Sequence, residues 1–448
     1  MTPRTASALL ALALLSTGCV DDGADDRADG GPADAATTTT FHVSCDGDDE
    51  RDGTTPDEAW RTLARANEAT LGPGDRLLLE RGCTWDGDRL DLTWSGTEDA
   101  RIEVDAYGDG PLPRIVNGAY QDLKFTGSYT TARNLSLGYT DLDETPCGQP
   151  IGDVFAVNFT GGAHHNTIAE SDIWGATAGV HLGRESSANR VIHNEIHDNV
   201  VKKSEETDPS LDLGAWGVLV VSDDNEVAYN TLRDNVAPCR NQGAPPSSNS
   251  IELFEGSGNR IHHNWSYGDR VFSELGSSDV EVASGNRWDY NLMVSDLDDA
   301  VFLITRGEGG EFGPVFDTTA THNTVYLTGE RSDAVVCGNG CGPDVLTLTG
   351  NVLDARRKAL FSDSVFPESH NVFWSSSGSP TLQSPIELDP TSAIVDPGFA
   401  DPATLDLRPG AGSPLIDAAG RARTHDEDLD RAPVDERPDI GAFERQDD

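Results

Sequence analysis

A short phrase built around asparagine recurs from residue 164 onward and constrains the fold of this chain more than any other feature. It reads asparagine, spacer, aliphatic residue, spacer, histidine or tyrosine, asparagine, spacer, aliphatic residue. The full phrase or its second half occurs at 189–196, 225–232, 259–264, 286–291, 322–325, 350–353 and 370–373. The second asparagines lie between 20 and 36 residues apart. A fixed phrase at variable spacing is typical of stacked coils with loops of unequal length inserted between them.

The residues between the asparagines predict short parallel β-strands. Apolar and polar residues alternate, as around Val191, over stretches too short for helices and too regular for a hairpin sandwich. Asparagine tolerates the left-handed backbone of a turn and can hydrogen-bond the asparagine of the next coil, about 4.8 Å away. The sequence therefore predicts an all-β fold made of a single parallel β-helix. The histidines and tyrosines before the second asparagine are expected to stack in the turn.

The phrase, the alternating strands at 179–182, 217–220 and 250–253, and the asparagine column resemble a right-handed parallel β-helix of the pectate-lyase-like superfamily. The opening around 52–63 and the ending around 413–417 and 439–444 are also similar to those of secreted β-helices. The resemblance implies a short capping helix at about 56–68 and polysaccharide as the substrate class. It implies no particular activity, because neither the Asp-containing set of polygalacturonases nor the Asp-Pro-His motif of mannuronan epimerases is present.

The N-terminus predicts export. Residues 6–15 form an apolar run behind Arg4, and small residues lead from the run into Cys19. Gly18-Cys19 resembles the end of a bacterial lipoprotein signal, which predicts that Cys19 is lipidated and that the protein is held at the outer membrane or cell surface. Ser16 stands where such signals usually have leucine, so secretion without a lipid is the alternative.

The rest of the chain divides by composition. We expect a signal peptide over 1–19, a disordered acidic tether over 20–40, an N-terminal cap with the first coils over 41–120, parallel coils over 121–378 and a closing segment over 379–448. The expected assembly is a monomer.

The cysteines agree with an oxidising compartment. If Cys19 is lipidated, an even number remains. Topology favours the disulfide pairs Cys45 with Cys83, Cys147 with Cys239, and Cys337 with Cys341. A zinc site is the alternative for the CGNGC loop at 337–341, although no second close pair with metal-ligand spacing is present.

The charge balance limits the partners. The chain has 77 acidic and 32 basic residues, a formal net charge of -45, and only four of the basic residues are lysines. Nucleic acid and anionic membrane surfaces are excluded as leading partners, so that membrane contact is expected only through the lipid anchor. A neutral polysaccharide, or an anionic one bridged by calcium, fits this charge best.

Long segments between strands predict a groove. Segments 140–152, 200–214 and 236–249 each follow an asparagine phrase and precede the next strand, so we expect them to project from one edge of the coil. Segment 306–318 instead follows directly after its strand, so we expect it to form the opposite wall of the groove. The strands along this groove are expected to begin near Val180, Val218, Ile251, Val271 and Val301.

Outward-facing polar residues on these strands are the candidate site residues. Neighbouring coils lie about 4.8 Å apart, which places Glu252 and Glu274 within one or two coil spacings of each other and of Arg306. We predict these three as catalytic residues. The predicted substrate-binding residues are His181, Glu255, His262, Asp269 and Arg270.

Two chemistries remain open for this group. Two carboxylates can serve a glycoside hydrolase as acid and base. With calcium as cofactor they can instead neutralise a uronate while Arg306 or a histidine takes the proton in a lyase reaction. The alternatives without catalysis are a polysaccharide-binding, adhesive or structural β-helix, in which the same residues form a solvated acidic face.

Overall fold

The structure is a computed structural model. The residues that it describes belong to one compact unit, Thr38–Asp448. The described ranges are 38–140, 153–200, 214–237, 248–378, 380–421 and 423–446. Among these residues no helix is long and apolar enough to cross a membrane.

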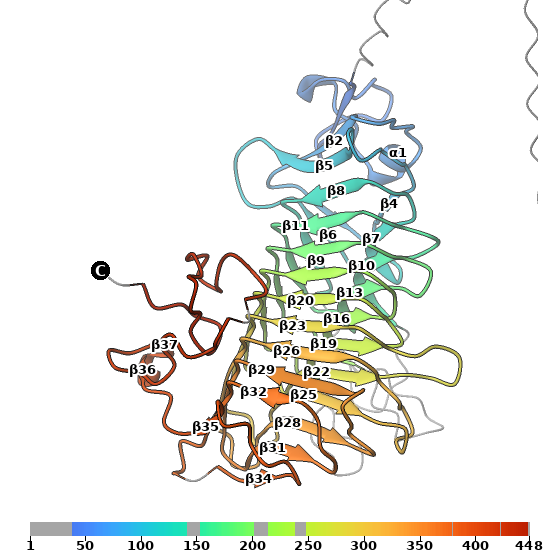
Figure 1. Cartoon of the computed structure of the whole chain (residues 1–448). Coiled ribbons are helices and arrows are strands. Elements are labelled where there is room, and N and C mark those ends of the chain that lie inside the picture. The colour runs from blue at the N-terminus through green and yellow to red at the C-terminus, as the bar shows by residue number, and fades with distance from the viewer. Residues whose placement is uncertain are drawn as a thin grey trace, which may run out of the picture. The chain divides into compact units, whose positions relative to one another are not determined.

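Three long parallel sheets build a solenoid, as the repeat predicts (Figure 1). We call these sheets A, B and C. In each regular coil the chain passes through sheet C, then sheet A, then sheet B, and each strand pairs with its equivalent in the next coil. Sheet A consists of β1 (Thr40–Val43), β2 (Arg76–Glu80), β5 (Ile102–Tyr107), β8 (Thr130–Arg133), β11 (Thr167–Ala169), β14 (Arg190–Ile192), β17 (Glu226–Ala228), β20 (Arg260–His262), β23 (Arg287–Asp289), β26 (Thr318–Thr321), β29 (Leu346–Thr349) and β32 (Glu368–Ser369).

Sheets B and C complete the coils. Sheet B consists of β3 (Thr84–Asp86), β6 (Arg114–Val116), β9 (Ser136–Gly138), β12 (Asp172–Trp174), β15 (Glu195–His197), β18 (Thr231–Arg233), β21 (Trp265–Tyr267), β24 (Leu292–Ser295), β27 (Thr324–Leu327), β30 (Val352–Ala355), β33 (Val372–Trp374) and β35 (Ala393–Ile394). Sheet C consists of β4 (Leu90–Leu92), β7 (Gln121–Phe125), β10 (Phe155–Phe159), β13 (Ala178–Leu182), β16 (Trp216–Val220), β19 (Asn249–Phe254), β22 (Val271–Gly276), β25 (Val301–Arg306), β28 (Asp333–Gly338), β31 (Lys358–Ser362) and β34 (Leu382–Gln383).

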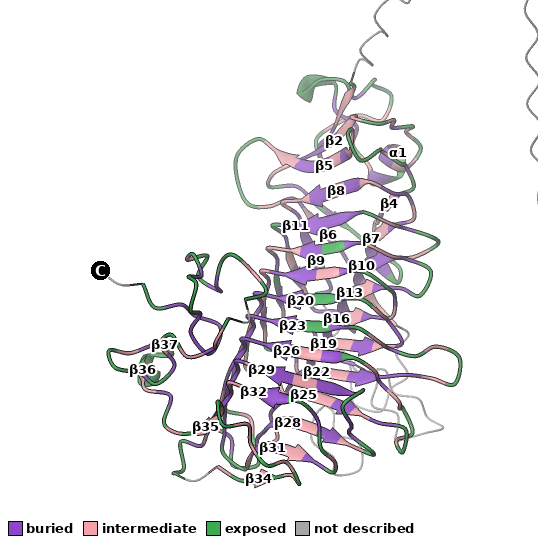
Figure 2. Ribbon diagram, in the orientation of Figure 1, coloured by how far each residue is buried: buried purple, intermediate pink, exposed green. Residues whose placement is uncertain are grey.

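The apolar core runs inside the coil because each strand turns its alternate residues inward. Exact registers stack like residues on like, as where the ring of Phe125 lies 4.3 Å from that of Phe159, centroid to centroid. In sheet A the inward residues Val191, Val227 and Ile261 follow one another in register and are fully buried. Figure 2 shows this pattern as buried stretches along the strands and exposed ones in the loops.

Buried asparagine ladders fill the corners of the coil. At the turn between sheets A and B, the side-chain amide of Asn230 donates to Asn264 (3.0 Å), and Asn264 donates to Asn291 (3.1 Å). The same contact joins the predicted second asparagines from Asn194 to Asn371, and the first asparagines form a similar ladder between sheets C and A. The predicted ladder is therefore confirmed.

A third ladder was not predicted. At the turn between sheets B and C, Asn199 donates to Asn235 (2.8 Å), and Asn235 donates to Asp269 (3.3 Å). Because the residue types vary here and the loops that follow are long, the sequence offers no repeated phrase for this corner.

The predicted aromatic stack is present as far as His322, and His370 has no ring contact among the described residues because Gly350 occupies the equivalent position of the coil between them. The rings of His193, Tyr229, His263, Tyr290 and His322 follow one another with centroids 4.7 to 5.3 Å apart. Each of these residues has a positive φ, which the turn between sheets A and B requires.

The C-terminal segment turns back along the outside of the coil (Figure 1), where it contacts this stack. Arg431 donates to Nδ1 of His193 (2.9 Å), and His322 Nδ1 lies 3.1 Å from the carbonyl oxygen of Asp439. Leu407 and Phe443 pack with residues of sheet B, and β36 (Phe399–Asp401), η2 (Pro402–Thr404) and β37 (Asp406–Pro409) lie in the same segment.

The N-terminal cap differs from the single helix expected at 56–68. It consists of η1 (Pro56–Glu58) and α1 (Leu63–Asn67). Between them, the backbone of Trp60 pairs with β1, donating to His42 and accepting from Ser44. This pairing requires extended backbone, so the helix is interrupted.

Two of the predicted disulfides are confirmed, Cys45–Cys83 and Cys337–Cys341. The second excludes the alternative of a zinc site in the CGNGC loop. Cys147, Cys239 and Cys19 lie outside the described residues. Disulfides are typical of proteins that fold in oxidising compartments, so the structure agrees with export.

Replacement of Asn264 by alanine tests the ladder. It leaves the buried backbone N–H of Asn230 without its acceptor and the carbonyl oxygen of Val227 without the amide donor of Asn264, so we expect the free energy of unfolding to fall by about 1 to 3 kcal/mol. The measurement is urea unfolding followed by circular dichroism. Asn339→Gly is the control, because that residue has a φ of 58° and lies outside the ladders; its change should stay within about 0.5 kcal/mol. Equal losses in both variants would contradict a special role for the ladder.

Candidate functional site

The outer face of sheet C carries the predicted site. Strand register aligns one outward residue from each coil into a row. In chain order this row contains Lys124, Asn158, His181, Leu219, Glu252, Glu274, Ile304 and Val336.

Glu252 and Glu274 are neighbours in this row. β19 and β22 pair Asn249 with Val271 and Leu253 with Leu275, which sets Glu252 opposite Glu274 on the adjacent coil. Neighbouring parallel strands are about 4.8 Å apart. The two carboxylates therefore project from the same face at neighbouring positions.

Each glutamate is held by a partner. Arg306, two residues beyond the row on β25, forms an ion pair with Glu274. The side-chain amide of Asn249 donates to Glu252. The Arg306 side chain is 12% exposed and that of Glu274 36%, so the carboxylate remains accessible to a ligand while the guanidinium is largely covered. The structure thus brings together the three residues predicted as catalytic.

The segment after β25 covers this end of the site, as its predicted role as a wall requires. Phe312 lies against Phe254, with ring centroids 6.1 Å apart, and the guanidinium of Arg306 lies 5.9 Å from the Phe312 ring centroid. The backbone N–H of Ser277 donates to the carbonyl of Phe312 (2.8 Å). These contacts fix the segment against the ends of β19 and β22.

The other predicted wall falls largely outside the described residues, because 141–152, 201–213 and 238–247 are not described. Their flanks are informative. Each gap follows a strand of sheet B, namely β9, β15 or β18, and precedes a strand of sheet C, namely β10, β16 or β19. All three segments therefore start and finish at the same corner of the coil.

His181 lies on the same face but apart from the glutamates. Its Nδ1 is 3.0 Å from Oδ1 of Asn158, and its ring stacks on Phe155 with centroids 4.5 Å apart. Burial lowers the pKa of His181 to about 4, so the ring is neutral near pH 7. Leu219 separates it from Glu252, which places it two coils away.

Three predicted substrate-binding residues lie elsewhere. Asp269 is fully buried, where it accepts from Asn235 N–H (2.7 Å) and Ser250 Oγ (2.6 Å), so it belongs to the third ladder and not to the groove. Burial raises the pKa of Asp269 to about 6. His262 lies on sheet A. Glu255 is 2% exposed and forms an ion pair with Arg184 beyond the end of β19.

Arg270 lies on the same coil as Glu274, four residues before it. It lies directly before β22, is half-buried, and has a buried Nε with no hydrogen-bond partner among the described residues. Its backbone carbonyl accepts from the N–H of Val301 (2.7 Å). Binding of substrate by Arg270 and His181 stays a prediction.

A hollow on sheet B was missed by the sequence analysis. It has a volume of about 560 Å³ and is lined by Pro111, Leu112, Arg114, Ser136, Asp172, Trp174, Glu195 and His197. Inside it, Asp172 accepts from Ser136 Oγ (3.0 Å), and its other oxygen lies 2.8 Å from Nε2 of His197. The spacing of these residues offered no signal, because they come from β6, β9, β12, β15 and the segment before β6, and only the structure gives the register of these strands.

Metal-binding groups are rare among the described residues. One group of three or more His, Cys, Asp or Glu side chains has its ligand atoms close together, and it comprises His262, His263 and His425, outside sheet C. Calcium at the glutamates therefore stays a prediction.

Comparison with known proteins supports the fold. No family model matches the chain. The structure of pectate lyase Pel9A is similar with a TM-score of 0.58 and 16% identity, covering 92% of this chain and 97% of that one. This likeness shows that the chain is a right-handed parallel β-helix, as predicted. A GH136 lacto-N-biosidase from Eubacterium ramulus has a TM-score of 0.49 and 15% identity, covering 80% of this chain and 67% of that one.

One curated protein shares a short stretch of sequence. Lacto-N-biosidase from Bifidobacterium longum subsp. longum is 40% identical over 75 residues, which is 16% of this chain. The match spans 5% of that protein's length.

The ion pair of His197 in the sheet B hollow predicts a pH-dependent stability. Burial disfavours the imidazolium, but hydrogen bonds to Asp172 and Asp198 outweigh it and raise the pKa of His197. The stabilisation is then complete below the unfolded pKa of about 6.5 and is lost as pH rises through the folded value. His197→Gln should therefore cost more stability near pH 5.5 than near pH 9 in urea unfolding. Equal costs at both values would contradict the ion pair.

Proposed function

We propose that the protein is an exported glycoside hydrolase that cleaves a polysaccharide along the outer face of sheet C. The observation that carries this proposal is the placement of Glu252 and Glu274 at paired positions of adjacent coils. Retaining glycosidases hold their two carboxyl groups about 5 to 5.5 Å apart, and inverting ones about 6.5 to 9.5 Å apart. Side chains that leave paired positions in parallel keep about the strand spacing of 4.8 Å, which is close to the first range, so we assign a retaining mechanism.

The partners of the two glutamates suggest their roles. Glu274 has the charged guanidinium of Arg306 beside it, whereas Glu252 accepts from the neutral amide of Asn249. We assign Glu274 as the nucleophile, because the guanidinium fixes the carboxylate in one orientation. Glu252 is assigned as the acid that protonates the leaving oxygen and then as the base that activates water. Arg306 is a positioning residue.

A lyase fits these contacts less well. β-Elimination needs a base beside the sugar ring, and Arg306 is engaged by Glu274 while His181 lies two coils away. The short stretch similar to a protein named lacto-N-biosidase also supports cleavage of a glycan. Calcium, as proposed for anionic substrates, would act by bridging a uronate to the carboxylates.

The charge of the protein favours a neutral glycan. With a formal net charge of -45, the surface repels polyuronates within the screening length of about 8 to 10 Å. A neutral chain meets no such barrier on its way to the groove.

Binding without cleavage is the second candidate, and the hollow on sheet B favours it. Trp174 lies there beside Asp172 and His197, with Arg114 over its ring at 5.4 Å. An aromatic surface with a few convergent polar groups is typical of ligand sites. Such a surface would hold a glycan chain without any catalytic residue.

Substitution of the two glutamates tests the hydrolase. Glu252→Gln and Glu274→Gln should each lower the release of reducing ends from the responsive polysaccharide by about 100-fold or more. Glu98→Gln is the matched control, because Glu98 is an exposed residue between β4 and β5, outside the segments assigned to the site, and the activity of this variant should be unchanged.

The products separate the alternatives. A retained anomeric configuration by NMR supports the assigned mechanism, and unsaturated products that need calcium would instead indicate a lyase. Activity that survives both substitutions would overturn the site. Retention of the protein in affinity gels without cleavage of any substrate in a panel would favour the binding module.

We also propose that Cys19 carries a lipid anchor, since Gly18-Cys19 resembles a lipoprotein signal. In cells fed a labelled fatty acid, the wild-type protein should take up label and enter the detergent phase. Cys19→Ser should do neither. Wild-type protein recovered unlabelled in the medium would indicate secretion without a lipid.

A further inference from the structure

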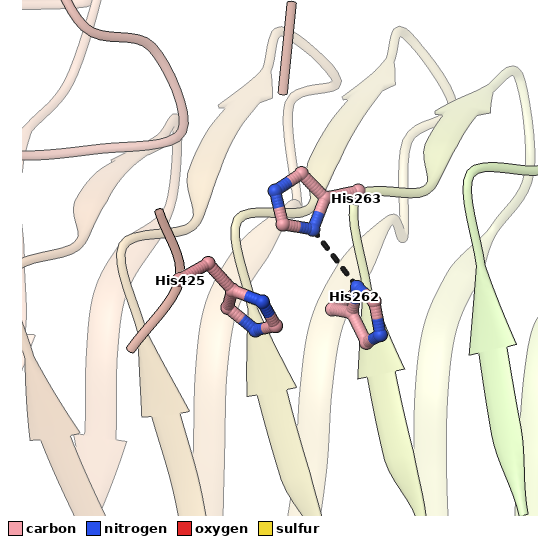
Figure 3. Close-up of side chains that lie close together, drawn as sticks. All are labelled: His262, His263 and His425. Carbon is pink, nitrogen blue, oxygen red and sulfur yellow. Dashed lines mark hydrogen bonds between the residues drawn. The ribbon is translucent and has the colours of Figure 1, made fainter. Parts of the chain in front are cut away.

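Three histidines meet where the C-terminal segment lies against sheet A (Figure 3). His262 ends β20, His263 occupies the turn that follows, and His425 comes from the returning C-terminal segment. One ligand atom from each lies within 4.8 Å of the others. His262 and His263 are buried, and His425 is half-buried.

The outer nitrogen atoms of two of these rings have fixed partners. Nε2 of His263 lies 3.0 Å from the carbonyl oxygen of Glu427, and Nε2 of His262 lies 3.1 Å from a carboxylate oxygen of Glu226. Both partners are acceptors, so each Nε2 carries the proton and donates. In a neutral imidazole the other nitrogen, Nδ1, then presents a lone pair.

These two Nδ1 atoms face each other at 2.9 Å. Two lone pairs at that distance repel unless a proton or a cation lies between or beside them. Ligands about 2.05 Å from a metal ion are about 2.9 Å apart at right angles and about 3.3 Å apart at the tetrahedral angle. The pair is therefore already close to the spacing of two ligands on one ion.

The surroundings also resemble those of metal-binding histidines. Such residues usually donate their second N–H to a carboxylate or a backbone carbonyl, which fixes the ring and exposes the other nitrogen. Glu226 and Glu427 supply these two acceptors here. The third ring has the same kind of neighbour, since Nε2 of His425 lies 3.6 Å from a carboxylate oxygen of the buried Asp289.

We propose that His262, His263 and His425 bind one transition-metal ion, most suitably zinc, and that the ion fastens the C-terminal segment to the coil. Imidazole ligands suit zinc, copper and nickel, whereas calcium and magnesium prefer oxygen ligands. Arg431 and Asp439 already contact the histidine and tyrosine stack. The ion would provide a further link between the C-terminal segment and the coil, joining residues far apart in the sequence. This proposed metal site lies outside the proposed hydrolase site, and the proposal does not depend on the hydrolase activity.

The test measures metal binding by the full-length protein, purified without a histidine tag and stripped with chelator. After dialysis against zinc, elemental analysis should find one zinc ion per chain, and the midpoint of thermal unfolding should rise, because a ligand of the folded state stabilises it. Cobalt in place of zinc should give a visible absorption band.

Two variants make the test specific. His425→Ala should weaken zinc binding by about 100-fold, as expected for the loss of one of three protein ligands, and should abolish the thermal shift. His193→Ala is the matched control, because it removes another ring of the stack that contacts the C-terminal segment but is not a member of the three-histidine group. It should bind zinc as the wild type does.

Several outcomes would overturn the proposal. These are the absence of zinc after dialysis, equal zinc binding by His425→Ala and wild type, or no change in the unfolding midpoint on addition of zinc or chelator. A proton shared by His262 and His263 would then account for their contact. Circular dichroism of each variant confirms that loss of zinc is not loss of fold.

Discussion

The buried amides of the asparagine ladders are the constraint on which the rest of the structure depends. A polar side chain can occupy the corner of a coil only if its hydrogen bonds are satisfied there, and the next asparagine, one strand spacing away, satisfies them. Each ladder amide therefore fixes the height and rotation of the following coil, as Asn230, Asn264 and Asn291 show. Loops of unequal length are tolerated between the corners because the ladder, and not the loop, sets the register.

The candidate groove follows from this register. Once β19 and β22 are aligned, Glu252 and Glu274 must project side by side from sheet C. Arg306 reaches Glu274 from the next coil, and Phe312 closes over the guanidinium from the segment that follows. The rigid coil thus supplies the precise placement, while the segment after β25 covers one end of the site, which is the usual division between scaffold and functional loops.

The outer edge between sheets A and B has a different role. Its histidines and tyrosines stack along the coil, and the C-terminal segment makes hydrogen bonds with ring nitrogen atoms of His193, His263 and His322. The proposed metal ion would strengthen the same contact. This edge is thus an internal docking surface, and His262, which ends β20 and contacts the ring of His425, belongs to it and not to the candidate groove.

The sequence by itself determined the coil, the ladder of its second asparagines, most of the aromatic stack, two disulfides and the row that contains Glu252 and Glu274. All of these repeat with the coil or join residues close in the chain, so they leave a periodic or local trace. Only the tertiary structure decided that Asp269 continues a third ladder, that Asp172, Trp174 and His197 line a hollow, and that His425 joins His262 and His263. Such contacts depend on the register of three sheets and on the path of a non-repeating C-terminal segment, and the packing of the folded chain fixes both.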